Sequence, residues 1–96
     1  MIKRMESGIA GKGLSFEFLT WIREAALSLG LKGVAFTKND GSVKVIAESE
    51  EATLEEFAKK LQEGADMFST VVENFYATLH EYGEMGDFYI SGEHQQ

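Results

Sequence analysis

The spacing of hydrophobic residues predicts a helix from about residue 15 to residue 29. Its apolar stripe, with intervals of three and four residues, consists of Phe18, Ile22, Ala25 and Leu29. Residues at these intervals share one face of a helix, so that face is expected to be buried. Ser15 is suited to cap the N-terminus of this helix. Gly30 is expected to end it in the left-handed conformation, with Leu31 packing back on the last turn.

A second amphipathic helix is predicted by four apolar residues at positions i, i+3, i+4 and i+7. These residues are Leu54, Phe57, Ala58 and Leu61. Thr53 and Glu56 have the spacing of a capping box, in which each side chain accepts a hydrogen bond from a backbone amide of the first turn. We therefore expect the helix to begin near Thr53 and to end at Gly64.

Strands are predicted where β-forming residues lie between turn signals. The expected ranges are 2–9, 34–38, 42–48, 70–79 and 88–90. Asn39-Asp40-Gly41 joins the second and third strands, and its Asp-Gly pair predicts a hairpin because both residues tolerate a positive φ. In the fourth strand, Val71 and Phe75 are expected to face one side of the sheet and Val72 the other, because successive side chains alternate.

The order of these elements is βαββαββ, which predicts an α+β domain of the ferredoxin-like type. In this α/β sandwich, an antiparallel sheet carries two helices on one of its faces. The chain of 96 residues is long enough for only one hydrophobic core. We expect a single domain over residues 1–92, followed by a flexible polar tail over residues 93–96.

Composition narrows the classes of partner. Nine basic and sixteen acidic residues give an acidic chain of net charge −7, so nucleic acids and anionic membranes are expected to be poor partners. No apolar run approaches the length of a membrane-spanning helix, and the N-terminus does not have the pattern of a signal peptide. The lack of cysteine excludes disulfides and thiolate metal sites and fits a reducing compartment. A soluble cytoplasmic protein is therefore expected.

The charge is unevenly distributed along the chain. Lys3, Arg4 and Lys12 lie near the N-terminus, where only Glu6 opposes them. A small anion such as phosphate can find a locally positive spot there. Scattered solubilising charge is the competing interpretation.

The segment from Gly30 to Gly64 resembles the acylphosphatase family. It contains, in order, a helix that ends in Leu-Gly-Leu, a strand that begins with glycine, an Asp-Gly-Ser-Val hairpin and an acidic helix with Leu-Glu-Glu-Phe. The sequence Gly86-Asp87-Phe88-Tyr89-Ile90 is similar to the closing strand of the family. The resemblance covers roughly two-thirds of the chain. It implies a hydrolase that acts on acyl phosphates without a metal or a cofactor.

The resemblance also implies a site for the phosphoryl group. In the family, a loop after the first strand holds the phosphate with its backbone amides. An arginine at the start of the first helix supplies charge, and an asparagine at the end of the second strand orients the attacking water. A dianionic phosphoryl group needs several donors, and the planar guanidinium group provides two of them at once.

The matching positions in this chain hold other residues. The candidate anion-binding loop consists of Ala10, Gly11, Lys12, Gly13, Leu14 and Ser15. Counted from Gly11, the arginine position is Ser15. Counted from Gly30, it is Leu19, because the segment is about one helical turn longer than in the family. The asparagine position is Thr37, so both catalytic side chains are expected to be missing.

The sequence is compatible with three functions. The first is a catalytically impaired acylphosphatase-like domain that binds an anion, or a protein partner through its sheet face or an edge strand. The second is a divergent, active acylphosphatase that uses Lys12, the loop amides and Thr37. The third is a small-molecule-binding regulatory domain with the ferredoxin-like fold. The fold alone does not choose between these functions.

Two further sequence patterns give little support to a nucleotide-binding or a metal-binding function. Gly8-x-x-Gly11-Lys12 lacks the spacing and the hydroxyl residue of a nucleotide-binding P-loop, and we interpret it as a strand-to-helix turn. His80 and His94 are the only histidines, and the residues around them do not have the spacing of a metal site.

Aromatic side chains are also candidates for a patch on the face of the sheet that the helices leave uncovered. Its candidate residues are Phe36, Tyr76, Tyr82 and Tyr89. RNA-binding sheets stack bases on such rings but combine them with basic residues, whereas Glu73, Glu81 and Glu84 lie nearby in this chain. Ordinary cross-strand packing is expected, with a protein contact as the alternative.

Overall fold

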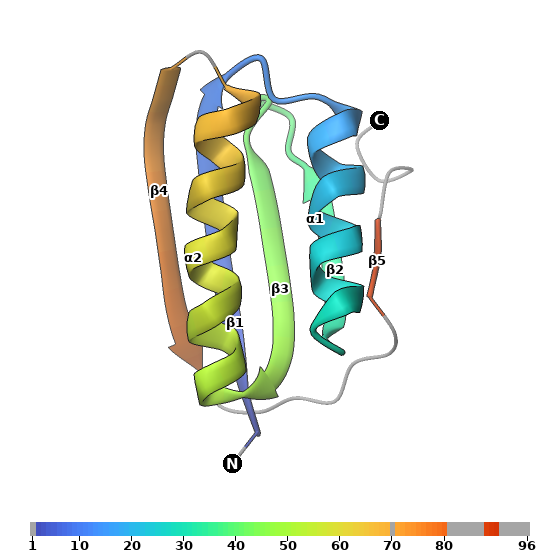
Figure 1. Ribbon diagram of the computed structural model, residues 1–96. Coiled ribbons are helices and arrows are strands. Elements are labelled where there is room, and N and C mark those ends of the chain that lie inside the picture. Colours follow the sequence, from blue (N-terminus) through green and yellow to red (C-terminus); the bar gives the residue numbers. More distant parts are fainter. Residues whose placement is uncertain (1, 70, 81–87, 91–96) are drawn as a thin grey trace.

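The structure is a computed structural model that describes residues 2–69, 71–80 and 88–90. Two helices lie side by side on one face of a five-stranded sheet (Figure 1). The elements in chain order are β1 (Ile2–Lys12), α1 (Phe16–Ser28), β2 (Lys32–Thr37), β3 (Val43–Glu50), α2 (Glu51–Phe68), β4 (Val71–His80) and β5 (Tyr89–Ile90). The predicted order βαββαββ is confirmed.

The sheet has the strand order β4-β1-β3-β2-β5. β1 pairs antiparallel with β3 on one side and with β4 on the other, and β3 pairs antiparallel with β2. These four strands and the two helices form the predicted α+β, ferredoxin-like sandwich. β5 differs from the expectation, because it pairs parallel with β2 at the edge of the sheet.

The hydrophobic core lies between the sheet and the helices. Its largest fully buried apolar side chains are Met5, Ile9, Phe18, Ile22, Val43, Val45, Leu54, Phe57 and Leu61. The stripes predicted for both helices supply several of them. The rings of Phe18, Trp21 and Phe68 contact one another between the two helices and extend the core outward. Burial of these side chains is the main force that holds the helices on the sheet.

α1 begins and ends close to the predicted positions. Ser15 is the N-cap residue, although its hydroxyl makes no capping hydrogen bond. Gly30 takes a φ of 72°, and its N–H donates to the carbonyl oxygen of Leu27 at 3.0 Å. The N–H of Leu31 donates to the carbonyl oxygen of Ala26, also at 3.0 Å. These two bonds form a Schellman motif, and the buried Leu31 side chain packs back as expected.

The predicted start of α2 is wrong. The helix begins at Glu51, directly after β3, and its N-cap residue Glu50 makes no side-chain capping bond. Thr53 therefore lies inside the helix, and its capping box with Glu56 does not start it. A carboxylate in the first turn favours this earlier start, because it interacts well with the positive end of the helix dipole.

The predicted end of α2 is also wrong, because the helix continues through Gly64 to Phe68. Gly64 is buried, and a Cβ atom on it would collide with the indole ring of Trp21 on α1. The glycine at this position allows α1 and α2 to approach each other closely. It has no role in ending the helix.

The β2–β3 hairpin has the three-residue loop Asn39-Asp40-Gly41 that the sequence predicts. The N–H of Lys38 donates to the carbonyl oxygen of Ser42 at 2.7 Å, and the N–H of Gly41 donates to that of Lys38 at 2.9 Å. Gly41 has a φ of 88°, whereas Asp40 does not have a positive φ. A three-residue hairpin loop needs only one left-handed residue, after a turn of ordinary handedness. The tolerance of Asp40 for a positive φ is therefore not used at this turn.

A bulge in β4 changes which of its side chains face the core. Glu73 is skipped in the pairing of β4 with β1, so it is the extra residue of the bulge. As a result, Val72 and Phe75 both pack against the core, and Val71 is 52% exposed. The prediction that Val71 shares a face with Phe75 is wrong, because the bulge interrupts the alternation of side chains between the two faces.

We predict that Gly64→Ala destabilises the protein although alanine is the better helix former. Helix propensity would add about 1 kcal/mol to the free energy of unfolding. The collision with Trp21 should cost more, because overpacking typically costs about 1–3 kcal/mol. We expect a net loss of about 1 kcal/mol in urea unfolding. Glu63→Ala, at the neighbouring exposed position, is the control and should leave stability nearly unchanged. An increase in stability for Gly64→Ala would contradict the close helix contact.

Candidate functional site

One end of the sheet brings together the segments that the sequence predicts to form the site. The C-terminal ends of β1 and β2, the loop over residues 13–15 and the start of α1 all lie there (Figure 1). The β2–β3 hairpin lies at the same end. The fold therefore places the candidate loop and Thr37 near one end of the molecule.

The candidate loop is shorter than the sequence predicts. Ala10, Gly11 and Lys12 are part of β1 and pair with β4, so the strand ends three residues later than expected. The interpretation of this glycine-rich segment as a turn is wrong for these residues. Gly13, Leu14 and Ser15 remain as the connection to α1. The backbone amides available to an anion are therefore fewer than in the predicted loop.

Ser69, which follows α2, fixes the end of β1. Its hydroxyl lies 2.5 Å from the carbonyl oxygen of Lys12 and 2.7 Å from that of Val71, and it is the donor to both. A Cβ atom on Gly11 would approach the Ser69 hydroxyl oxygen to 2.6 Å. The glycine is therefore required by this contact. Ser69 was not predicted from the sequence as a residue of this region.

The start of α1 offers donors and little net charge. Gly13 has a φ of 88° and turns the chain from β1 toward the helix. The amides of Phe16 and Glu17 precede the first hydrogen bonds of the helix and can bind an anion, whereas the amide of Phe18 donates to the carbonyl oxygen of Ser15 at 3.0 Å. Lys12 is exposed beside them, but Glu17 places a carboxylate in the same first turn. Attraction of an anion by Lys12 is therefore partly offset.

Two of the predicted site positions differ strongly in accessibility. Ser15 is exposed at the N-cap, whereas Leu19 is only 4% exposed and belongs to the hydrophobic core. A side chain at Leu19 cannot reach a ligand without leaving the core. Thr37 is half-buried at the end of β2 and pairs with the buried Val43. Of the two alternatives for the arginine position, only Ser15 lies on the surface beside the loop.

Both arginines of the chain lie away from this loop. Arg4 is near the opposite end of β1, where its Nε atom lies 3.1 Å from a carboxylate oxygen of Glu48. Arg23 lies in the middle of α1 with its Nη1 atom 3.3 Å from a carboxylate oxygen of Glu24. The ion pairs of both guanidinium groups therefore lie outside the loop over residues 13–15.

The described residues contain no group of three or more His, Cys, Asp or Glu side chains placed to hold a metal ion. His80 is exposed, and its Nε2 atom lies 3.0 Å from the Thr78 hydroxyl. In the same part of the chain, no helix is long and apolar enough to cross a membrane. His94, Tyr82, the Tyr89 side chain and the predicted tail over residues 93–96 lie outside the described residues.

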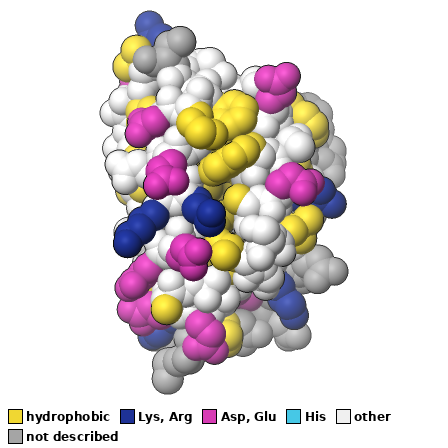
Figure 2. All heavy atoms as spheres, viewed as in Figure 1, with side chains coloured by type: hydrophobic (Ala, Val, Ile, Leu, Met, Phe, Trp, Pro, Cys, Tyr) yellow, Lys and Arg dark blue, Asp and Glu magenta, His cyan; other side chains and the backbone are white. Residues whose placement is uncertain are grey.

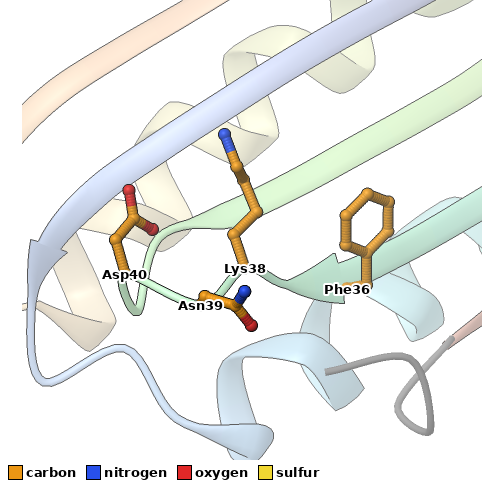
Figure 3. A pocket seen from close by; sticks show the side chains of 4 residues that line it. All are labelled: Phe36, Lys38, Asn39 and Asp40. Carbon is orange, nitrogen blue, oxygen red and sulfur yellow. The ribbon is translucent and has the colours of Figure 1, made fainter. Parts of the chain in front are cut away.

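Acidic side chains are spread over the helix-bearing face, with hydrophobic ones grouped toward one end (Figure 2). The opposite face of the sheet, here called the open face, carries two adjoining cavities beside the hairpin. One, of about 350 Å³, is lined by Phe36, Lys38, Asn39 and Asp40 (Figure 3). The other, of about 190 Å³, extends from Lys38 and Asp40 to Tyr76 and Asn74 on β4. The sequence analysis considered the rings but missed the charged residues beside them.

Asp40 is held in a defined orientation at the hairpin. The hydroxyl and the backbone N–H of Ser42 donate to its Oδ1 atom at 2.6 and 2.9 Å. These hydrogen bonds lower the pKa of Asp40, and the positive charge of Lys38 lowers it further. Asp40 is therefore ionised at neutral pH, and its carboxylate has a fixed position at the rim of both cavities.

Comparison with known proteins identifies similar sequences. The family model described as acylphosphatase matches residues 9–90. An acylphosphatase from Mannheimia succiniciproducens is 31% identical over 74 residues, which cover 75% of this chain and 80% of the relative. An acylphosphatase from Pasteurella multocida is 32% identical over 73 residues, which cover 74% of this chain and 79% of the relative.

Solved structures share the fold at lower sequence identity. The acylphosphatase from Coxiella burnetii superposes with a TM-score of 0.81 at 21% identity, over 94% of this chain and 93% of that one. The acylphosphatase from Bacillus subtilis gives a TM-score of 0.76 at 22% identity, over 95% and 99% of the two chains. Full-length HypF in its phosphate- and nucleotide-bound form gives 0.81 at 20% identity, over 98% of this chain but 13% of that one.

We predict that the Arg4–Glu48 pair has a structural role. The Glu48 side chain is 3% exposed and that of Arg4 is 30% exposed, so Arg4→Met leaves a carboxylate with less compensation in a buried position. Breaking a fully buried pair costs about 3–5 kcal/mol, and the partial exposure of Arg4 reduces the expected loss to about 2 kcal/mol. Arg23→Met, which removes an exposed pair, is the matched control. Equal unfolding midpoints in urea for the two variants would contradict this role.

Proposed function

The chain belongs to the acylphosphatase family, and we propose that it is a catalytically impaired member that binds small anions at the start of α1. The observation that supports this proposal is that Ser15, which the count from Gly11 assigns to the family arginine, is exposed, whereas the alternative Leu19 is buried. The short, neutral side chain of Ser15 has one hydroxyl group and no charge. The two arginines of the chain are engaged elsewhere, with Glu48 and Glu24.

The chemistry of the reaction explains why this substitution matters. Charge builds up on the phosphoryl oxygens during hydrolysis, and a guanidinium group aimed at them stabilises that charge. Loss of one such preorganised donor typically costs a factor of about 10² to 10³ in rate. Lys12 can supply a point charge but not the planar pair of donors. Slow turnover at most is therefore expected.

The second substitution affects the attacking water. An asparagine amide at the end of β2 both donates to and accepts hydrogen bonds from a water molecule. Thr37 retains one hydroxyl at this place and is half-buried. A hydroxyl group can hydrogen-bond a water molecule, but it makes fewer hydrogen bonds than an amide group and therefore orients the water less well. The loss of orientation adds to the loss of charge at Ser15.

Anion binding is proposed because the backbone around the loop does not depend on the missing side chains. Gly13 has the positive φ that turns the chain toward the helix, and the amides of Phe16 and Glu17 lie at an exposed helix start. Lys12 lies next to them. These groups support weak binding of phosphate, which Glu17 opposes through its negative charge.

A divergent active acylphosphatase is the second candidate. The relatives with 31% and 32% identity are named acylphosphatases, which favours retained activity. In this alternative, Lys12 replaces the arginine as the source of positive charge, and Thr37 holds the water. Efficient turnover would then depend on Lys12, which makes this residue the point at which the two candidates differ.

A protein partner is a further proposal for the impaired domain. β4 is an edge strand that pairs only with β1 within the described residues, and it exposes Val71 and Leu79. An extended segment of another protein can add to such an edge through main-chain hydrogen bonds. The bulge at Glu73 interrupts the edge and limits such pairing to the rest of the strand.

We predict that the wild-type protein hydrolyses benzoyl phosphate little faster than buffer does. Inorganic phosphate should shift the amide resonances of Gly13 and Ser15, with a dissociation constant in the millimolar range or weaker. Lys12→Ala should reduce these shifts without changing the rate of hydrolysis. Lys59→Ala, on the exposed face of α2, is the matched control for charge and should change neither.

Either half of the proposal can fail separately. Turnover well above buffer that disappears in Lys12→Ala would support the divergent enzyme instead of the impaired one. Phosphate that shifts no resonance between residues 12 and 17 would contradict the anion-binding proposal, whatever the rate.

A further inference from the structure

We propose that the open face of the sheet binds a free amino acid with a planar side chain. The site is the cavity of about 190 Å³ between the hairpin and β4. Its binding groups are Lys38, Asp40, Asn74 and Tyr76. This face lies opposite the helices, so the site is separate from the start of α1 and does not rest on the function proposed above.

Tyr76 provides a surface on which a planar group can stack. It lies on β4 opposite Gly8, and a Cβ atom on Gly8 would collide with its ring, so the ring extends over the glycine. Lys44 on β3 is opposite Gly8, and Phe36 on β2 is opposite Lys44. The two rings therefore lie in one row across four strands. Tyr76 remains 40% exposed, which leaves part of the ring accessible.

Lys38 and Asp40 place opposite charges on the rim of the cavity. Lys38 extends over β3 with its ammonium group toward β1, and the Asp40 carboxylate points to the same side of the sheet (Figure 3). Both residues line the cavity, yet they do not form an ion pair with each other. The Oδ1 atom of Asp40 is held by Ser42. Two opposite charges that stay apart can each bind one end of a zwitterion.

The charges of the cavity favour a zwitterion over a simple anion. Lys44 lies 3.5 Å from a carboxylate oxygen of Glu6, which largely neutralises it. Lys38 then remains as the cation of the site and Asp40 as its anion. An α-amino acid matches this pair, with its carboxylate on Lys38 and its ammonium group on Asp40. The side-chain amide of Asn74 can hydrogen-bond either group.

The size of the cavity favours a small molecule over a macromolecule. Its volume of about 190 Å³ is below the roughly 300–1,000 Å³ of pockets for drug-sized ligands. A nucleic acid strand stacked on Tyr76 and Phe36 would bring its phosphates toward Asp40 and Glu6, which repel them. A single amino acid with one ring avoids this repulsion and can stack on Tyr76.

The first test is a titration with L-phenylalanine followed by amide resonances. We expect shifts at Gly8, Ala10 and Lys44, which surround the cavity, and none at residues 13–15. Three analogues separate the contributions: 3-phenylpropionate lacks the ammonium group, phenethylamine lacks the carboxylate and L-alanine lacks the ring. Each should bind about tenfold more weakly than L-phenylalanine, because each loses one charged or stacking contact.

The second test uses variants of the binding groups. Lys38→Gln, Asp40→Asn and Tyr76→Thr should each weaken L-phenylalanine binding about tenfold. Asn at position 40 still accepts hydrogen bonds from Ser42, so the hairpin should keep its structure. Lys32→Gln makes the same charge change on the open face at the other end of β2, and should leave affinity unchanged. Unfolding curves establish that each variant is folded.

Several results would overturn the proposal. L-Phenylalanine that shifts no resonance of the open face, or shifts only residues 13–15, excludes this site. Binding of 3-phenylpropionate as tight as that of L-phenylalanine excludes recognition of a zwitterion. Binding that tolerates Tyr76→Thr but not Phe36→Leu places the ligand in the neighbouring cavity. A single-stranded oligonucleotide that binds more tightly than L-phenylalanine, through Lys38 and Tyr76, identifies a nucleic acid surface instead.

Discussion

The pairing of β1 with two neighbours is the constraint on which the rest of the molecule depends. β1 runs from Ile2 to Lys12, and its residues pair with β3, with β4 or with both. Its end is fixed by the hydroxyl of Ser69 at the carbonyl oxygen of Lys12. Because β1 cannot slide, the chain must turn at Gly13 and start α1 at Phe16. Ser15 is one of the residues that face the solvent at that turn.

The side chains at the candidate site can therefore change without a change in the backbone fold. Gly33 has a φ of 148°, and a Cβ atom on it would collide with the backbone of Ile46, so the sheet requires a glycine there. At the end of α1, Gly30 is favoured for a different reason, because its φ of 72° is left-handed although a Cβ atom would meet no other atom there. Nothing in the packing requires a particular side chain at the exposed position 15. A family member can lose its arginine there without losing its fold, which is the basis of the proposed impairment.

The sequence predicted the features that depend on local patterns. The apolar stripes identified both helices, and Gly30 with Leu31 identified the Schellman motif. The features that it missed depend on contacts between distant segments. Gly64 looked like a helix end because its partner, Trp21, lies on the other helix. The bulge at Glu73 shows only in the pairing of β4 with β1. The side of the sheet on which the Val71 side chain lies could therefore not be predicted from the alternation of residues along the strand.

The residues of the candidate sites also divide into those that local patterns indicate and those that depend on contacts between distant segments. Ser15 and Thr37, which the resemblance to the family suggests as site positions, lie near one end of the sheet, and counting left Leu19 as an alternative to Ser15. Leu19 is buried in the core, whereas Ser15 is exposed, so only Ser15 is accessible to a ligand. The charged groups of the open face were missed because Lys38 and Asp40 come together with Tyr76 only through the order of the strands.

The central claim is that the scaffold persists and that only two side chains limit the reaction. The most direct measurement is the rate of benzoyl phosphate hydrolysis by the double variant Ser15→Arg/Thr37→Asn, compared with the wild-type protein. We expect the rate to rise by a factor of at least about 10², because a preorganised guanidinium group is restored at the loop. A double variant that folds normally and hydrolyses no faster than the wild-type protein would contradict the account.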